Sequence, residues 1–138
     1  GYDNGKISEG TNIDDAVTFA NKSNIDAMAI SVGNTHLQTS KKANIDFKKI
    51  NLIGAKTKIP LVLHGSSGIP VEQRKKLSRK TKVAKLNIGT EIRMTFGKAL
   101  RKNLKNNPKT YDRLQLLKPT IKDLTKVTKK IIRQIGPN

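Results

Sequence analysis

The alternation of short apolar segments with longer amphipathic ones constrains the fold of this chain more than any other feature of its sequence. The apolar segments have the length of β-strands and cover residues 25–33, 59–63 and 83–88. The segments around them have helical spacing or helix-capping residues and cover residues 14–22, 46–56, 70–79, 91–106 and 119–135. Strands that alternate with helices favour right-handed crossovers and a parallel sheet, so we expect an α/β fold. The first apolar segment predicts a strand buried on both faces.

Polar residues follow the end of each predicted strand. His36 follows the first strand, His64 ends the second, and the third ends in residues 87–90. A loop of glycines and serines, residues 65–68, comes directly after His64. The carboxyl ends of parallel strands meet at one rim, and α/β folds bind ligands there, so we expect a binding site at this rim.

The residue types at this rim suit a metal ion beside an anion. Two imidazoles after adjacent strands can converge on one ion, because neighbouring parallel strands lie about 4.8 Å apart. The alternative is that each is a hydrogen-bonded loop histidine. Residues 65–68 and 87–90 precede predicted helices, so they offer backbone N–H groups, hydroxyls and a helix dipole to a phosphate. For Thr90 the alternative is an ordinary helix cap.

Charge and composition limit the classes of function. The chain has 138 residues, the length of one domain, and 28 Lys and Arg against 10 Asp and Glu give it a net charge of +18. This charge suggests a polyanion partner, but the basic residues are expected on outer helix faces without interleaved aromatic side chains, which argues against nucleic-acid binding. They include Lys48, Lys49, Arg74, Lys75, Lys76, Lys98, Arg101, Lys102, Lys105, Lys126, Lys129 and Lys130. With no cysteine and no apolar run of about 18 residues, we expect no disulfide, no membrane span and a cytoplasmic location.

Three segments carry a resemblance to a known family. Residues 29–36, 60–70 and 83–93 resemble, in order and spacing, the last three strand motifs of the class II fructose-bisphosphate aldolases. Residues 1–5 are similar to the family's Gly-rich loop after the fifth strand, and residues 117–119 to the start of its C-terminal helix. The resemblance implies a zinc-dependent lyase on a (β/α)₈ TIM barrel. Residues 1–138 would then be one partial domain, the C-terminal half with about strands six to eight and their helices.

The resemblance also implies an activity and a site. The family cleaves fructose 1,6-bisphosphate to dihydroxyacetone phosphate and glyceraldehyde 3-phosphate, and its zinc polarises the ketone and stabilises the enediolate. Its second and third zinc-ligating histidines match His36 and His64. Its phosphate loop matches Gly65 and Ser67, its substrate-contacting asparagine matches Asn87, and a phosphate-binding threonine matches Thr90. A homo-oligomer is implied as well. The alternatives are a tagatose-bisphosphate aldolase, or a non-enzymatic basic α/β remnant that binds polyanions.

The sequence also departs from the family pattern. Leu37 and Ser66 stand where the family has glycines, and Asp112-Arg113 stands where an Asp-Pro-Arg segment is expected. The family's first zinc histidine and catalytic aspartate lie on an earlier strand that these residues do not include, so we assign no catalytic residue within the chain. The chain begins at Gly1 in a predicted loop, and we therefore expect it to be a piece of a longer protein without turnover of its own.

Overall fold

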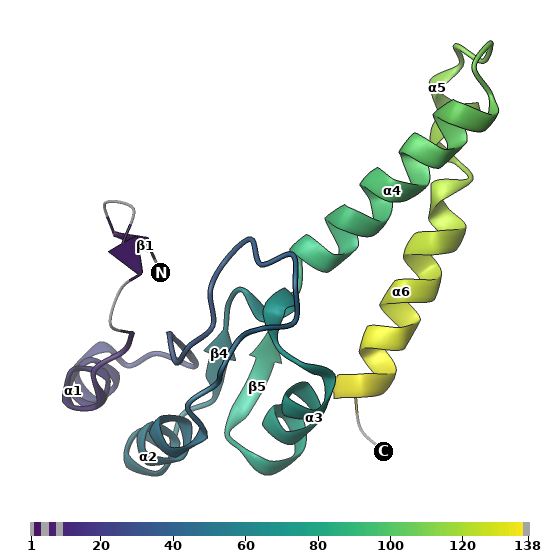
Figure 1. Ribbon diagram of the computed structural model, residues 1–138. Coiled ribbons are helices and arrows are strands. Elements are labelled where there is room, and N and C mark those ends of the chain that lie inside the picture. The colour runs from purple at the N-terminus through teal and green to yellow at the C-terminus, as the bar shows by residue number, and fades with distance from the viewer. Residues whose placement is uncertain (1, 4–5, 8–9, 137–138) are drawn as a thin grey trace.

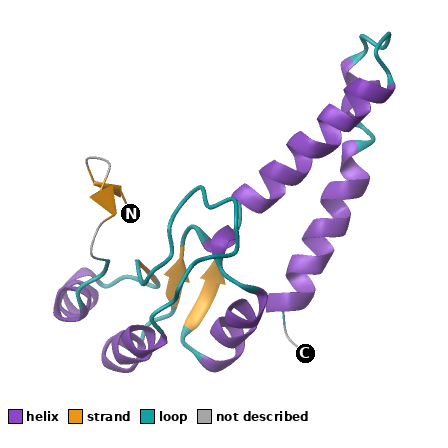
Figure 2. Ribbon diagram, in the orientation of Figure 1, coloured by secondary structure: helices purple, strands orange, loops and turns teal. Residues whose placement is uncertain are grey.

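A computed structural model describes residues 2–3, 6–7 and 10–136 and contains a three-stranded parallel sheet (Figures 1 and 2). The strands are β3 (Met28–Ile30), β4 (Leu61–Leu63) and β5 (Val83–Leu86), in the order β3-β4-β5. Ala29 of β3 pairs with Val62 of β4, whereas the register between β4 and β5 shifts at Leu61/Val62. The expected α/β fold with parallel strands is confirmed.

Helices connect and flank these strands. They are α1 (Ile13–Ser23), α2 (Phe47–Thr57), α3 (Val71–Lys80), α4 (Thr90–Asn106), α5 (Arg113–Leu117) and α6 (Thr120–Ile135). All except α5 match a predicted helix to within one residue at each end. The sequence pattern predicts neither α5 nor the short 3-10 helix η1 (Ser66–Gly68).

The N-terminal residues are described in part. Strands β1 (Tyr2–Asp3) and β2 (Lys6–Ile7) pair antiparallel. The Gly-rich loop expected at residues 1–5 includes positions 1, 4 and 5, which lie outside the described residues.

The first strand of the parallel sheet is shorter than predicted. β3 covers residues 28–30 of the expected 25–33. The chain leaves the strand through a turn in which Gly33 has φ +94° and the Asn34 side-chain oxygen accepts a hydrogen bond from the Val32 N–H at 2.6 Å. A side chain captures the backbone donor here, so the strand ends before the apolar run does.

One face of the sheet is buried within the described chain and the other is open. Met28 and Ile30 of β3 and Leu61 and Leu63 of β4 are buried. They belong to a core cluster that also contains Ala16, Val32, Ala43, Ile45, Ile50, Ile53, Ile69, Leu77 and Val83. Ala29, between the two buried residues of β3, is exposed. The prediction that this strand is buried on both faces is therefore wrong for the chain as described.

Helices α4, α5 and α6 form an arm, residues 90–135, that extends from the sheet (Figure 1). Helix α4 packs against α6, and the C-terminal part of α6 returns to α3. The apolar residues of α6, which include Ile121, Ile131 and Ile132, have the spacing of one helical stripe. Ile131 is buried, but Ile121 and Ile132 are exposed, because the neighbouring helices cover only one side of α6.

No helix in the described part of the chain is long and apolar enough to cross a membrane.

Two isoleucines allow a test of this core assignment. Replacing Ile53 of α2, which is fully buried, with Ala should lower the free energy of unfolding by about 2–5 kcal/mol, because it leaves a cavity. The same change at Ile132 of α6, which is 57% exposed, should cost less than about 0.5 kcal/mol. Both positions are helical, so the change in helix propensity is shared. Urea unfolding measures both values, and equal costs would contradict the assignment.

Candidate functional site

The six predicted site residues line one hollow at the carboxyl ends of the parallel strands. His36 follows β3, His64 follows β4, and the centroids of their rings lie 5.8 Å apart at an interplanar angle of 55°. The hollow has a volume of about 420 Å³, and its lining includes Gly65, Ser67, Asn87 and Thr90. The expected convergence at one rim is therefore present, while the roles of these residues stay predictions.

Asn34 connects the two histidine-bearing loops. Its side-chain N–H₂ group donates to the Ile30 carbonyl at 3.3 Å and to the His64 carbonyl at 2.9 Å. The side chain is buried, so these bonds replace the ones it would make with water. Asn34 thereby fixes the end of β4 relative to the end of β3. Sequence reasoning missed this residue, although a polar residue next to a turn glycine was a signal.

Close contact between the same loops requires a glycine at position 65. Gly65 has φ +62°, and a side chain there would collide with the Thr35 carbonyl oxygen. Leu37, which replaces a family glycine, also has a positive φ of +58° and is 71% exposed at the edge of the hollow. A branched side chain in this backbone region is strained, so the structure explains why glycine suits position 37 better.

Asn87 lies against His64. Its side-chain nitrogen is 3.2 Å from Nδ1 and 3.3 Å from Nε2 of the imidazole, so which ring nitrogen it contacts as a donor depends on the tautomer. The Asn87 N–H donates to the Leu63 carbonyl at 2.8 Å, and its carbonyl accepts from the Ser66 N–H at 3.1 Å. These bonds continue the pairing of β4 with β5 past their ends and bring the two loops together.

Ser67 supplies the cap of α4. Its hydroxyl oxygen accepts a hydrogen bond from the Glu91 N–H at 3.1 Å, while the residue at the cap position, Gly89, has no side chain to do so. Thr90 is the first helical residue, so its alternative interpretation as the helix cap is wrong. Because the Ser67 oxygen acts as an acceptor, its O–H proton stays available for an anion.

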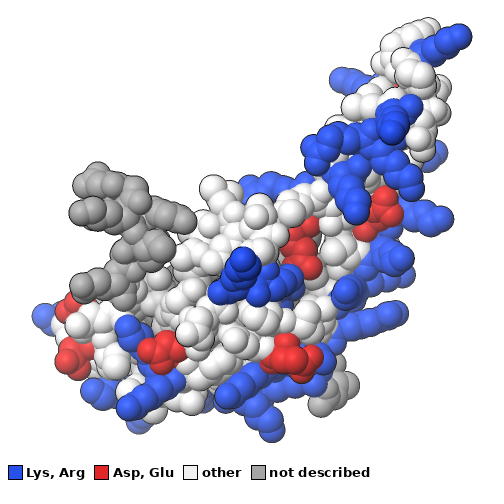
Figure 3. All heavy atoms as spheres, viewed as in Figure 1, with Lys and Arg blue, Asp and Glu red and all other residues white. Residues whose placement is uncertain are grey.

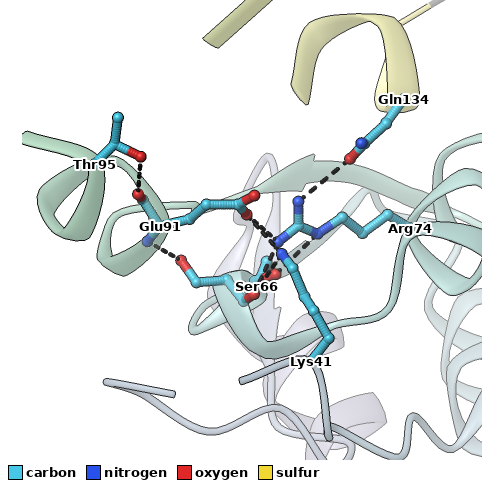
Figure 4. Close-up of polar contacts among 7 residues, drawn as sticks. Lys41, Ser66, Arg74, Glu91, Thr95 and Gln134 are labelled. Atoms are coloured by element: carbon cyan, nitrogen blue, oxygen red, sulfur yellow. Dashed lines mark hydrogen bonds and ion pairs between the residues drawn. The ribbon is translucent and has the colours of Figure 1, made fainter. Parts of the chain in front are cut away.

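Next to this loop lies an ion-pair cluster of the buried Arg74, the half-buried Glu91 and the exposed Lys41 (Figure 4). The Arg74 guanidinium and the Lys41 ammonium each lie 2.6 Å from the same carboxylate oxygen of Glu91. The expectation that Arg74 is on an outer helix face is wrong, because its side chain is fully buried. The sequence gives no signal for this cluster, because its members are far apart along the chain.

One carboxylate faces two cations in this cluster, and burial together with this excess of positive charge shifts the pKa values of Glu91 and Lys41. Burial by itself raises the pKa of Glu91, but hydrogen bonds from Lys41 and Arg74 outweigh it and hold the pKa below its usual value. Burial lowers the pKa of Lys41 despite the hydrogen bond to Glu91, and the positive charge of Arg74 contributes to the lowering. The carboxylate therefore stays ionised at neutral pH.

The two histidines are the candidate metal ligands among the described residues at the rim. Imidazole nitrogens suit Zn²⁺, and two rings at this separation can reach one ion, since each Zn–N bond is about 2.0–2.1 Å long. No group of three or more His, Cys, Asp or Glu that could hold a metal occurs among the described residues. The two histidines fit part of a zinc site, and a third ligand would have to come from outside them.

Arg93 is a lining residue that sequence reasoning did not assign. It projects from the first turns of α4 into the same hollow, and its guanidinium lies over Gly89. It is exposed and forms no ion pair with any residue that the structure describes. Its position in a helix turn next to the predicted anion loop was the available signal.

Comparison with known proteins identifies the family of this chain. The family model for "Fructose-bisphosphate aldolase class-II" matches residues 2–138, and the chain belongs to this family. The chain is 35% identical over 115 residues to a fructose-bisphosphate aldolase of Staphylococcus epidermidis, covering 83% of this chain and 40% of the relative. It is 35% identical over 114 residues to a 6-phospho-5-dehydro-2-deoxy-D-gluconate aldolase of Bacillus licheniformis, covering 81% and 38%.

Solved structures agree with this family assignment. The YdjI aldolase of Escherichia coli K12 superposes with a TM-score of 0.71 at 26% identity, over 91% of this chain and 44% of that one. The fructose-bisphosphate aldolase of Campylobacter jejuni superposes with a TM-score of 0.73 at 18% identity, over 92% and 45%, and shows the same fold. The chain thus spans about two fifths of the length of the curated relatives it matches.

The lowered pKa of Glu91 predicts a pH-dependent contribution to stability. The pKa is lower in the folded than in the unfolded chain, so the contribution is fully present above the ordinary value of 4.5 and is lost as the pH falls through the folded-state pKa. The variant Glu91→Gln should be less stable than the wild type at pH 7 by on the order of 2 kcal/mol. This difference should shrink as the pH falls toward 3.

Urea unfolding of both proteins between pH 7 and pH 3 measures the difference. Glu72→Gln is the matched control, because Glu72 forms an exposed pair with Lys75 at 3.0 Å and should cost less than about 1 kcal/mol. A difference between wild type and Glu91→Gln that stays constant over this range would show that the Glu91 charge does not stabilise the fold.

Proposed function

We propose that this chain is the C-terminal half of a class II aldolase, with about strands six to eight of a (β/α)₈ barrel. The complete protein would reversibly cleave fructose 1,6-bisphosphate to dihydroxyacetone phosphate and glyceraldehyde 3-phosphate. The observation that carries the proposal is the 5.8 Å separation of the His36 and His64 rings beside the loop at 65–68. Tagatose 1,6-bisphosphate and the deoxygluconate phosphate in the name of the B. licheniformis relative are the alternative substrates.

The loops at the rim would hold the phosphorylated end of the substrate. Gly65 has no side chain, so the backbone of its loop can lie close to Thr35. Ser67 contributes a hydroxyl at the start of α4. Thr90 offers a second hydroxyl in the first turn of the same helix, where the dipole favours an anion. Asn87, beside His64, would contact the oxygens of the substrate, and Arg93 would attract its second anionic group.

His36 and His64 would hold a zinc ion between the two strand ends. When bound, Zn²⁺ polarises the ketone oxygen and stabilises the negative charge left when the carbon–carbon bond breaks. The chain's own contribution is to hold the His64 imidazole beside Asn87 and the His64 backbone carbonyl through Asn34, which lies on the loop that carries His36. Such contacts orient metal ligands, and their loss typically weakens metal binding.

Proton transfer needs a group that this hollow does not contain. The retro-aldol step removes a proton from the hydroxyl of the aldehyde-forming half and later returns a proton to the carbon that leaves with the ketone. The lining residues described here include no Asp or Glu. A general acid–base group typically contributes about 10²–10⁴-fold, so these 138 residues alone should not turn over substrate.

A polyanion-binding role is the competing proposal, and one observation favours it. Lys and Arg gather along the arm at residues 90–135 (Figure 3). A hollow of about 430 Å³ between α4 and α6 is lined by Lys98, Lys102, Lys126 and Lys130 with the single acid Asp123. Four lysines in one groove attract polyanions, but this gives no reason for the histidine pair. The cytoplasmic location and the homo-oligomer expected from the sequence stay predictions.

Shared metal ligation can be tested by comparing single and double substitutions. His36→Ala, His64→Ala and the double variant should each lose at least about tenfold in Zn²⁺ affinity, because removing either ligand destroys the same site. A competition titration with a chromophoric chelator measures the affinity. The chain has only these two histidines, so no other imidazole interferes. Independent losses that add up in the double variant would contradict a shared ion.

The half-barrel proposal predicts activity only on complementation. The 138-residue chain should show no cleavage of fructose 1,6-bisphosphate with added zinc, because the described residues place neither a third zinc ligand nor a carboxylate base at the rim. Mixing it with a separately expressed N-terminal half from a class II aldolase should give chelator-sensitive cleavage.

The same mixture made with His64→Ala is the control and should stay inactive. Cleavage by the chain alone, or equal activity with the His64→Ala chain, would overturn the proposal. Binding of polyanions without any activity on mixing would favour the competing function.

A further inference from the structure

The buried arginine of α3 is the least expected feature of the molecule. Arg74 is fully buried, and a buried guanidinium is costly unless its donors are satisfied. Its donors reach three other elements: η1 through Ser66 and Ser67, α4 through Glu91, and α6 through Gln134 (Figure 4). The longest of these contacts, to the Gln134 side-chain oxygen, is 3.4 Å.

Two of these bonds fix the backbone of the predicted phosphate loop. The Arg74 Nε donates to the Ser66 carbonyl at 3.2 Å, and Nη2 donates to the Ser67 carbonyl at 2.9 Å. Lys41 donates to the same Ser67 carbonyl at 2.8 Å. Two cations therefore hold one carbonyl oxygen, and the loop cannot rotate its peptide groups without breaking charge-assisted bonds.

The orientation of the carbonyls determines that of the neighbouring N–H groups. The described chain has no cis peptide, and in a trans peptide the C=O and N–H groups point in opposite directions. With the Ser66 and Ser67 carbonyls turned toward Arg74, the N–H groups of Ser67 and Gly68 point away from it. The Ser67 N–H has no acceptor among the described residues, and Ser67 lines the hollow that contains the histidines. An anion there would satisfy this donor.

The cluster also places positive charge behind the loop. Arg74 and Lys41 share the single carboxylate of Glu91, which leaves a net charge of +1. Arg74 is completely shielded from water, so its charge is screened less than that of a surface lysine.

We propose that Arg74 is a positioning residue that, with Glu91 and Lys41, sets the backbone of residues 65–68 for binding a phosphate group. The inference rests on the proposed function in assigning that loop to a phosphate. It does not require Arg74 to touch the substrate.

Titration with inorganic phosphate tests this proposal. The backbone amide signals of Ser67 and Gly68 in the NMR spectrum monitor the binding. Arg74→Met, which keeps an apolar stem but removes the guanidinium donors, should raise the Kd for phosphate by about tenfold or more. Arg74→Lys keeps the charge but not the fork of donors, so it should restore only part of the affinity. Arg79→Met, at an exposed position of the same helix, makes the same change in net charge and should leave Kd within about twofold.

A purely structural role for Arg74 would shift or broaden signals throughout the core, whereas positioning should perturb mainly Ser67 and Gly68. Phosphate affinity in Arg74→Met or in Arg74→Lys equal to that of the wild type would overturn the proposal.

Because Arg74→Met removes a buried charge, Lys41→Met is a second variant that leaves the core intact. It should raise Kd by about threefold relative to its exposed neighbour control Lys42→Met, and equal values would also count against the proposal.

Failure of the proposed function has a different signature. If the wild-type chain shows no phosphate-induced shifts at residues 65–68, the assignment of the loop to a phosphate is wrong. Hydrogen exchange without phosphate then decides the positioning role. Exchange at Ser67 and Gly68 that is about tenfold faster in Arg74→Met than in Arg79→Met supports it, and equal rates refute it.

Discussion

The parallel pairing of three short strands is the constraint on which the rest of the structure depends. Because β3, β4 and β5 run in one direction, the three loops that follow them meet at one rim. Polar bonds continue the pairing where the strands end: Asn34 binds the His64 carbonyl, and Asn87 binds the Leu63 carbonyl. The middle of each strand packs in the apolar core, and the polar site residues follow the strand ends. Strands of only three or four residues can therefore still bring two imidazoles together.

The open face of the sheet fits the proposal that the chain is part of a larger barrel. In a closed barrel each strand has two neighbours and the inner face is filled by side chains from other strands. Here β3 and β5 each have one partner in the described chain, and Ala29 is exposed on the face opposite the core. Unpaired strand edges are a liability for an isolated domain. The proposed half barrel therefore accounts for the exposed face without further assumptions.

The sequence predicts the helices well because their signals are local. Asn12 and Asp46 accept hydrogen bonds from the first turns of α1 and α2, as cap residues do. The length of β3 is not predictable in this way, since a side chain of the following turn ends it. Arg74 lies three positions before the buried Leu77, on the core side of α3. A basic residue at such a position is normally solvated, and only the folded chain reveals its distant acceptors.

A buried ion pair such as that of Arg74 contributes little net stability, so we infer that the main effect of this side chain is to orient the neighbouring backbone. A buried ion pair is often no more stabilising than an apolar side chain of similar volume, because desolvation offsets the Coulombic gain. An apolar residue at position 74 could fill the same space, but it could not bind the carbonyls of Ser66 and Ser67. What the guanidinium adds is a fixed direction for two peptide groups beside the histidine pair. In the proposed function such a restraint favours binding, since a loop that is already fixed would lose less entropy when it binds a phosphate.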